Sequence, residues 1–108
     1  MSVKIEISGE VVTAYLDGEL DHHAAKAIRE EIDRTVERNT PSLLVLDFRD
    51  VTFMDSSGIG LVMGRYRLMK GLNGEIHVCN PSPQIEKVMK LSGVDRLANL
   101  QNYRNGQA

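Results

Sequence analysis

The sequence predicts one α/β domain with a mixed, mostly parallel sheet, and two patterns carry this prediction. After the first two strands, apolar runs typical of strands alternate with amphipathic stretches of helical period. The resulting order is β-β-α-β-α-β-α plus a short final element. Strands joined through a helix run parallel. The first two are joined only by a short turn at Gly9 and Glu10, so we expect them to form an antiparallel hairpin.

The predicted hairpin consists of residues 3–7 and 11–16. In the first segment apolar and polar side chains alternate, which is the pattern of a half-buried strand. The second segment is rich in β-branched and other apolar residues. Gly18 and Glu19 are expected to end the second strand.

A helix is predicted over residues 22–38, with Asp21 as its N-cap, because aspartate readily accepts a hydrogen bond from the first backbone N–H groups of a helix. Its apolar residues recur at helical spacing and form one stripe opposite a charged, solvated face that includes Asp33. The stripe consists of Ala25, Ile28, Ile32 and Val36.

Residues 43–48 form a nearly continuous apolar run, typical of a central strand covered on both faces. A second helix is predicted over about 57–70, because apolar residues again recur at helical spacing. They are Ile59, Val62, Met63, Tyr66 and Met69.

The last third of the chain predicts a fourth strand over 75–79 and a helix over 83–91. Ser82 caps this helix, Pro83 begins it and Gly93 follows its end. Its inward residues are Ile85, Val88 and Met89. Residues 97–100 are expected to form a short strand or a helical turn, and the polar residues 101–108 a loose tail.

Composition limits the classes of function. Of 108 residues, 42% are hydrophobic and 26% charged, which fits one globular domain spanning 1–108. The 13 basic and 15 acidic residues are interspersed and give a net charge of −2, without the basic run expected for binding nucleic acid or a membrane surface. A protein partner is therefore expected.

The single cysteine, Cys79, lies in an apolar run and is expected to be a buried, unreactive thiol, with no second cysteine for an internal disulfide. The first residues alternate in polarity rather than forming a signal peptide, and no apolar run approaches the roughly 20 residues that span a bilayer. We therefore expect a cytoplasmic protein.

Residues 54–60, Met-Asp-Ser-Ser-Gly-Ile-Gly, place two hydroxyls beside a carboxylate where a strand gives way to a helix. One interpretation is that Asp55 or Ser56 serves only as an N-cap. The other is that Ser56 accepts a phosphate. The helix macrodipole would accommodate this group, which adds about two negative charges to the surface.

The residues do not indicate catalysis, a metal site or a cofactor. No Gly-x-Ser-x-Gly elbow surrounds Ser56 or Ser57. His22 and His23 are adjacent on a helix and point about 100° apart, unlike the i, i+4 pair of a zinc site. The glycines at 58 and 60 lack the lysine of a phosphate-binding loop and the third glycine of a dinucleotide site.

Two segments carry a family resemblance. Residues 18–23, Gly-Glu-Leu-Asp-His-His, and 53–60, Phe-Met-Asp-Ser-Ser-Gly-Ile-Gly, resemble the anti-sigma factor antagonists of the STAS domain family. The resemblance extends through residues 64–66 and 74–79, covers nearly all the chain, and is greatest to the sporulation branch that antagonises the anti-sigma-F factor in spore-forming bacilli.

The resemblance implies a regulator of transcription rather than an enzyme. In the family the anti-sigma factor is a serine kinase that phosphorylates the first serine after the aspartate, which is Ser56 here. Unphosphorylated antagonist binds that kinase and frees the sigma factor, phosphorylation ends binding, and a PP2C-type phosphatase restores it. The expected partner-binding residues are Asp21, His22, His23, Asp55, Ser56, Ser57, Gly58, Ile59 and Gly60.

Two other classes of function compete with this one. A phosphoaspartate receiver needs paired acids after its first strand and a lysine after its last, and neither position supplies them. A small esterase would use Ser56 with His22 or His23 as its base.

Overall fold

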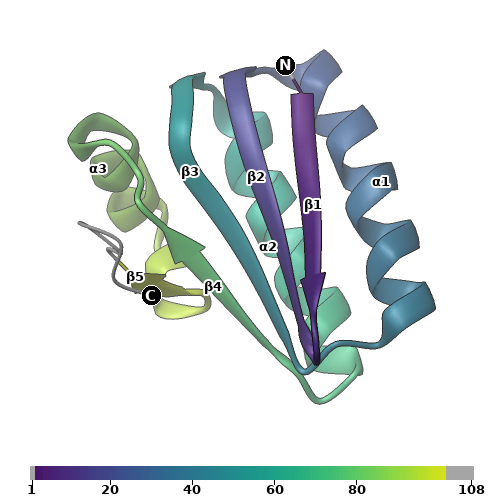
Figure 1. Ribbon diagram of the computed structural model, residues 1–108. Helices are drawn as coiled ribbons and strands as arrows, with labels where there is room; N and C mark the ends of the chain where they lie inside the picture. The colour runs from purple at the N-terminus through teal and green to yellow at the C-terminus, as the bar shows by residue number, and fades with distance from the viewer. Residues whose placement is uncertain (1, 102–108) are drawn as a thin grey trace.

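The computed structural model describes residues 2–101, which form five strands, three α-helices and one 3-10 turn (Figure 1). In chain order they are β1 (Ser2–Ser8), β2 (Val11–Leu20), α1 (His22–Asn39), β3 (Leu43–Met54), α2 (Ser56–Gly71), β4 (Glu75–Cys79), α3 (Pro83–Ser92), the 3-10 turn η1 (Val94–Arg96) and β5 (Asn99–Gln101). The predicted order is confirmed, and the short final element is a turn followed by a strand. The loose tail was expected to begin at residue 101, but Gln101 belongs to β5, and residues 102–108 lie outside the described residues.

The strands form one sheet in the order β1-β2-β3-β4-β5. β1 and β2 pair antiparallel, and every later neighbouring pair is parallel. The mixed, mostly parallel sheet predicted from the sequence is therefore confirmed. Because successive parallel strands are joined through helices, the starts of those helices follow the carboxyl ends of the strands.

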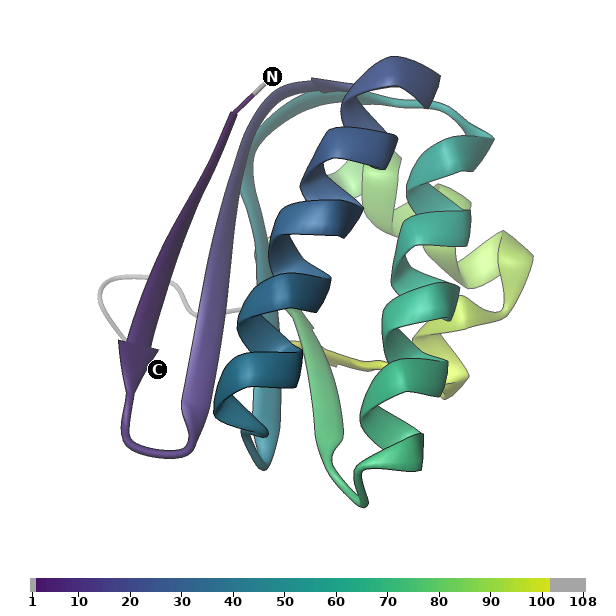
Figure 2. The same ribbon diagram turned by 90° about the vertical axis from the view of Figure 1, so that its right-hand side faces the viewer.

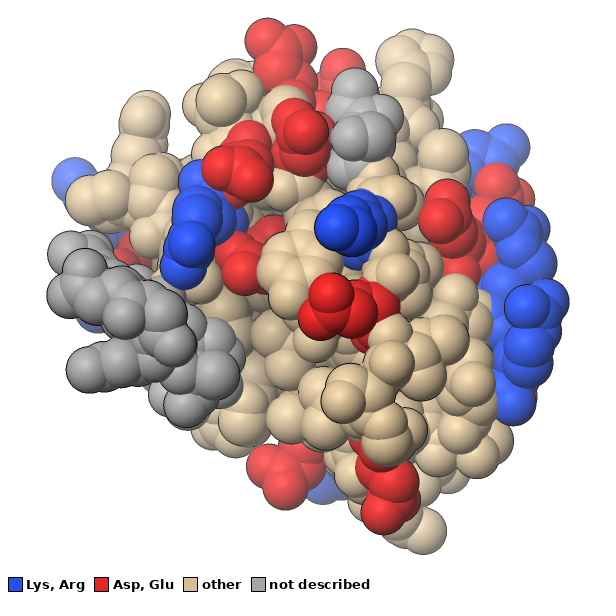
Figure 3. Space-filling view, in the orientation of Figure 1, with Lys and Arg blue, Asp and Glu red and all other residues tan. Residues whose placement is uncertain are grey.

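The helices lie on one face of the sheet, with α1 and α2 side by side (Figure 2). Only one face of the sheet is therefore covered. In β2, Val12, Ala14 and Leu16 are buried on that face, while the residues between them are partly exposed on the other. The prediction that β3 is covered on both faces was therefore wrong. Val45, on the uncovered face, is only 7% exposed because it lies between paired residues of β2 and β4. Charged side chains of both signs are interspersed on that face (Figure 3).

The core lies between the sheet and the helices. α1 contributes Ile28, Ile32 and Val36, as its stripe predicted, although Ala25 is only partly buried. Each fully buried Leu, Ile or Phe contributes about 1.5–3 kcal/mol relative to an exposed one. The sheet side of this core consists mainly of Val12, Ala14, Leu16, Leu44, Leu46, Phe48, Ile76 and Val78.

α3 begins and ends as predicted. Ser82 Oγ accepts a hydrogen bond from Ile85 N at 3.2 Å, and Gly93 ends the helix at φ 84°. Ile85 and Met89 are buried, but Val88 is 39% exposed, so its predicted inward position was wrong. Val88 is offset by about 100° from Met89 around the helix, away from the side on which Ile85 and Met89 are buried.

β2 and β3 are longer than predicted. β2 continues past Gly18 and Glu19 to Leu20, and β3 continues to Met54. The register of their parallel pairing shifts twice, once between Tyr15 and Asp17 and once between Gly18 and Glu19. Gly18 has φ 93°, which a residue without a Cβ adopts readily, so it accommodates the irregularity instead of ending the strand.

Gly58 makes the close approach of α2 to the strand ends possible. A Cβ at this position would overlap Met54 Cγ and Sδ and lie 3.1 Å from Leu20 Cδ2. The start of α2 therefore rests directly on both strands.

We predict that Gly58→Ala lowers the free energy of unfolding by about 1–2 kcal/mol. Overpacking costs roughly 1–3 kcal/mol, and alanine recovers up to about 1 kcal/mol of helix propensity. Gly60→Ala is the matched control, since its Cβ meets no atom within 4 Å, and it should be neutral or stabilising. Urea denaturation measures both, and equal stabilities would contradict the packing account.

Candidate functional site

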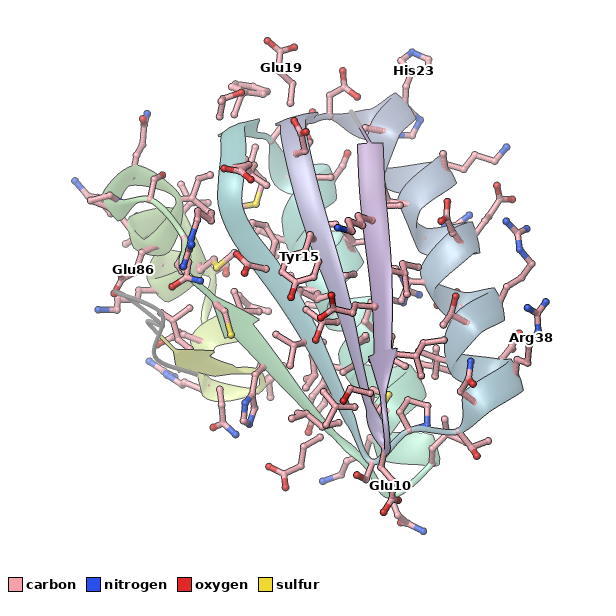
Figure 4. The ribbon with its side chains drawn as sticks, in the orientation of Figure 1. Glu10, Tyr15, Glu19, His23, Arg38 and Glu86 are labelled. Atoms are coloured by element: carbon pink, nitrogen blue, oxygen red, sulfur yellow. The ribbon has the colours of Figure 1, made fainter. Side chains whose placement is uncertain are left out.

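The loops that start α1 and α2 lie side by side. Leu20 and Met54 are paired in the parallel register, and Asp55 N donates a hydrogen bond to Leu20 O at 3.3 Å. Asp21 and Asp55 follow directly, so two helix N-termini begin next to each other. This is the end of the molecule where Glu19 and His23 project (Figure 4).

Each aspartate caps the helix that follows it. Asp21 Oδ1 accepts a hydrogen bond from Ala24 N at 2.9 Å, and Asp55 Oδ1 accepts one from Ser57 N at 2.8 Å. The Ala24 N–H is the main cause that lowers the pKa of Asp21, and the charge of His23 adds to it. Of the two capping alternatives for α2, the structure selects Asp55, and Ser56 is the first helical residue.

Ser56 is exposed, and among the described residues none forms a hydrogen bond with its hydroxyl. Ser57 differs in two ways, because it is partly buried and its backbone N–H is bound by the cap. Along the next turn Gly58 is buried, Ile59 partly buried and Gly60 exposed. The Ser56 hydroxyl is thus the more exposed of the two, at the positive end of a helix dipole.

His22 and His23 are exposed in the first turn of α1, with ring centroids 5.8 Å apart and rings inclined by 65°. Within residues 2–101 neither histidine hydrogen-bonds to a serine hydroxyl, so the structure does not assemble the serine and base that an esterase would require. No group of three or more His, Cys, Asp or Glu side chains in the described part of the chain is placed to hold a metal ion.

Two features of the structure were missed in the sequence analysis. The first is Phe53, an aromatic residue that is 52% exposed at the end of β3, paired with Glu19 and two residues before the cap. The predicted strand ended at residue 48, so Phe53 was assigned to neither face of the sheet in the sequence analysis.

The second is the ion pair between Arg65 of α2 and Asp33 of α1, with Nε and Oδ1 2.8 Å apart. The two atoms approach without the alignment of a hydrogen bond. Burial lowers the pKa of Arg65 and raises the pKa of Asp33, and the attraction between the two charges opposes both shifts. The sequence placed Asp33 on the solvated side of its helix, because a pairing partner on another helix gives no local signal.

A groove of about 520 Å³ runs between α1 and α2 from the paired N-termini. Its lining residues are His22, Ala25, Lys26, Arg29, Ser57, Gly60, Leu61, Gly64 and Arg65. It joins three predicted site residues, His22, Ser57 and Gly60, to the buried Arg65, and so extends the candidate site beyond the two loops.

Comparison with known proteins identifies the family. Residues 2–105 match the family described as STAS domain. The chain belongs to the STAS domain family. Within that family it is 33% identical over 97 residues to the anti-sigma F factor antagonist of Paenibacillus polymyxa, covering 90% of this chain and 83% of that protein. It is 40% identical over 88 residues to the anti-sigma F factor antagonist of Lysinibacillus sphaericus, covering 82% and 75%.

Solved STAS domain structures agree with this assignment. The anti-sigma factor antagonist SpoIIAA in its unphosphorylated form superposes with a TM-score of 0.85 at 34% identity, covering 96% of this chain and 90% of that one. The Bacillus cell fate determinant SpoIIAA in its phosphorylated form gives 0.78 at 34% identity, covering 96% and 93%. The predicted family and fold are thus confirmed. Within the described residues, no helix of this STAS domain is long and apolar enough to cross a membrane.

We predict that Asp55→Ala lowers the free energy of unfolding by about 1 kcal/mol, because it removes the N-cap of α2. Ser56→Ala should change it by less than about 0.5 kcal/mol, because the side chain is exposed and caps nothing. Chemical denaturation of both variants tests the assignment of the cap. The reverse order of stabilities would return the capping role to Ser56.

A further prediction concerns the lowered pKa of Asp21. Its cap stabilises the fold fully above the ordinary carboxyl pKa of 3.8 and is lost as pH falls through the lowered value. Asparagine also caps but does not titrate in this range, so the stability of wild type relative to Asp21→Asn should fall as pH is taken from 5 towards about 2. Unfolding free energies measured across that range decide the point, and a constant difference would contradict it.

Proposed function

We propose that this chain is an anti-sigma factor antagonist that acts in the cytoplasm through a partner switch. Its unphosphorylated form binds an anti-sigma factor that is also a serine kinase, and so releases the sigma factor. Phosphorylation of Ser56 ends the binding, and a PP2C-type phosphatase restores it. The observation that carries this proposal is the exposed, unbonded Ser56 hydroxyl at the start of α2, in a fold shared with named antagonists.

The geometry favours Ser56 over Ser57 as the phosphate acceptor. A kinase must bring a hydroxyl into line with the γ-phosphate of ATP, which requires an exposed side chain. Ser56 meets this requirement, whereas Ser57 is partly buried against the α1–α2 groove. The chain acts here as a substrate, and family membership sets aside the receiver and esterase alternatives.

Phosphate on Ser56 would act mainly on binding. It adds about two negative charges one residue after Asp55, whose carboxylate is held in place by Ser57 N. Free in solution, the phosphate is hydrated and lies near the positive end of α2. Under a partner it would be desolvated beside a second negative charge, which costs binding free energy.

The proposed partner surface combines both loops. It consists of Asp21, His22, His23, Asp55, Ser56, Ser57, Gly58, Ile59 and Gly60, with Phe53 added from the structure. Buried Gly58 contributes by setting the position of α2 rather than by direct contact. The exposed aromatic ring of Phe53 is the kind of side chain that anchors protein interfaces.

We predict that incubation with the cognate anti-sigma kinase and ATP places one phosphate on Ser56. Ser56→Ala should accept none and still capture the anti-sigma factor, because alanine removes the acceptor without adding charge. Ser57→Ala, the matched control, should still be phosphorylated. Peptide mass mapping gives the position, and phosphate on Ser57 of the wild-type protein would refute the assignment.

We also predict that phosphorylation weakens anti-sigma binding about a hundredfold, equivalent to about 3 kcal/mol, mainly through faster dissociation. Ser56→Asp should show a smaller loss, since a carboxylate has less charge and fewer acceptor oxygens than a phosphate. Surface plasmon resonance compares the three forms. Equal affinities for phosphorylated and unphosphorylated protein would rule out the switch.

A further inference from the structure

The groove between α1 and α2 is basic. Of its lining residues, Lys26 and Arg29 of α1 are exposed cations, His22 stands at the end nearest Ser56, and Arg65 lies buried on the α2 side. No lining residue is acidic. Figure 2 shows the two helices that form its walls side by side.

Arg65 is buried, and the hydrogen-bonding capacity of its guanidinium is not filled. Its side chain is only 8% exposed, and Nε and Nη1 are buried without hydrogen bonds. Asp33 is its only ion-pair partner among the described residues, and the positive charge of Arg29 opposes the effect of Asp33 on the pKa of Arg65. Asp33 is one negative charge against the three positive charges of Lys26, Arg29 and Arg65, so the groove is net positive and favours an incoming anion.

Two helical glycines leave the groove open. A Cβ at Gly60 or Gly64 would meet no atom within 4 Å, so close packing of the backbone does not require glycine at either position. Each glycine costs the helix about 1 kcal/mol relative to alanine. Their absent side chains leave room above Arg65 along the wall that α2 contributes.

We propose that the α1–α2 groove receives an acidic segment of the anti-sigma factor, with carboxylates contacting Lys26 and Arg29 over the buried charge of Arg65. The inference rests on the proposed function and extends its interface from the loop residues along the two helices as far as Arg29 and Arg65. An acidic protein segment is the occupant whose charge complements the groove, and Gly60 and Gly64 of α2 leave space for it. Arg65 acts through its charge, since its buried N–H groups are out of reach.

The decisive comparison uses two double variants that each remove two exposed positive charges from α1. Lys26→Gln with Arg29→Gln changes the groove. Arg34→Gln with Arg38→Gln changes the same helix outside the groove, and Arg38 lies at the far end of α1 from His23 (Figure 4).

Isothermal titration with the cognate anti-sigma factor should show at least tenfold weaker binding for the groove variant and less than threefold change for the control. The difference should narrow as salt is raised, because exposed charge pairs are screened. Equal affinities of the two variants, whether both unchanged or both weakened, would overturn the inference. A wild-type protein that does not bind the anti-sigma factor at all would instead overturn the proposed function, and this inference with it.

Shape is tested with Gly64→Ala, which places a methyl group in the groove, and with Gly71→Ala outside it as the control. Gly64→Ala should melt at a higher temperature yet bind the anti-sigma factor several-fold more weakly, while Gly71→Ala should bind like wild type. Unchanged affinity in Gly64→Ala would show that no partner segment enters the groove.

A small anion is the competing occupant, and inorganic phosphate and ATP are titrated separately into the free protein. Binding of neither, or binding unaffected by the groove variant, agrees with a protein segment as occupant. Saturable binding that the groove variant loses, with its anti-sigma affinity unchanged, would overturn the proposal in favour of a phosphate site.

Discussion

Parallel pairing of β2 with β3 as far as Leu20 and Met54 determines where the proposed site forms. Each strand leads directly into a helix, so pairing the strands to their ends also brings together the two helix N-termini. The hydrogen bond from Asp55 N to Leu20 O connects the second loop to the first. Without this pairing, Asp21 and Asp55 would cap two helices that begin at unrelated places on the surface.

The site is separated from the interactions that stabilise the fold. The apolar core lies between the sheet and the helices, whereas the Ser56 side chain is in solvent. A charge added at Ser56 therefore leaves the buried apolar area unchanged. Gly58 is the point where the two regions meet, because it carries the first turn of α2 and packs on Met54. This division explains how a modification can change binding without unfolding the domain.

What could be predicted from the sequence was local. Asp21 as a cap, the stripe of α1 and Gly93 at the end of α3 each depend on neighbours within a few residues, and each is confirmed. The lengths of β2 and β3 could not be predicted, because each strand is extended by pairing with the other, which is distant in sequence. This pairing carries β2 past Gly18 to Leu20 and β3 to Met54. The Asp33–Arg65 pair and the groove around it depend on how two helices meet in space. The residues of the two loops could be predicted from the sequence. That they share one surface, and that Phe53 is exposed beside them, could be seen only in the structure.

The central claim is that phosphate on Ser56 acts by local charge while the backbone stays in place. It is tested most directly by comparing amide chemical shifts of the free protein with and without the phosphate, assigned residue by residue. The account predicts changes confined to residues 20–23 and 53–61, where the two loops and the first turn of α2 lie. Large changes through residues 43–46 and 76–79, in the paired central strands, would show a rearranged core and contradict it.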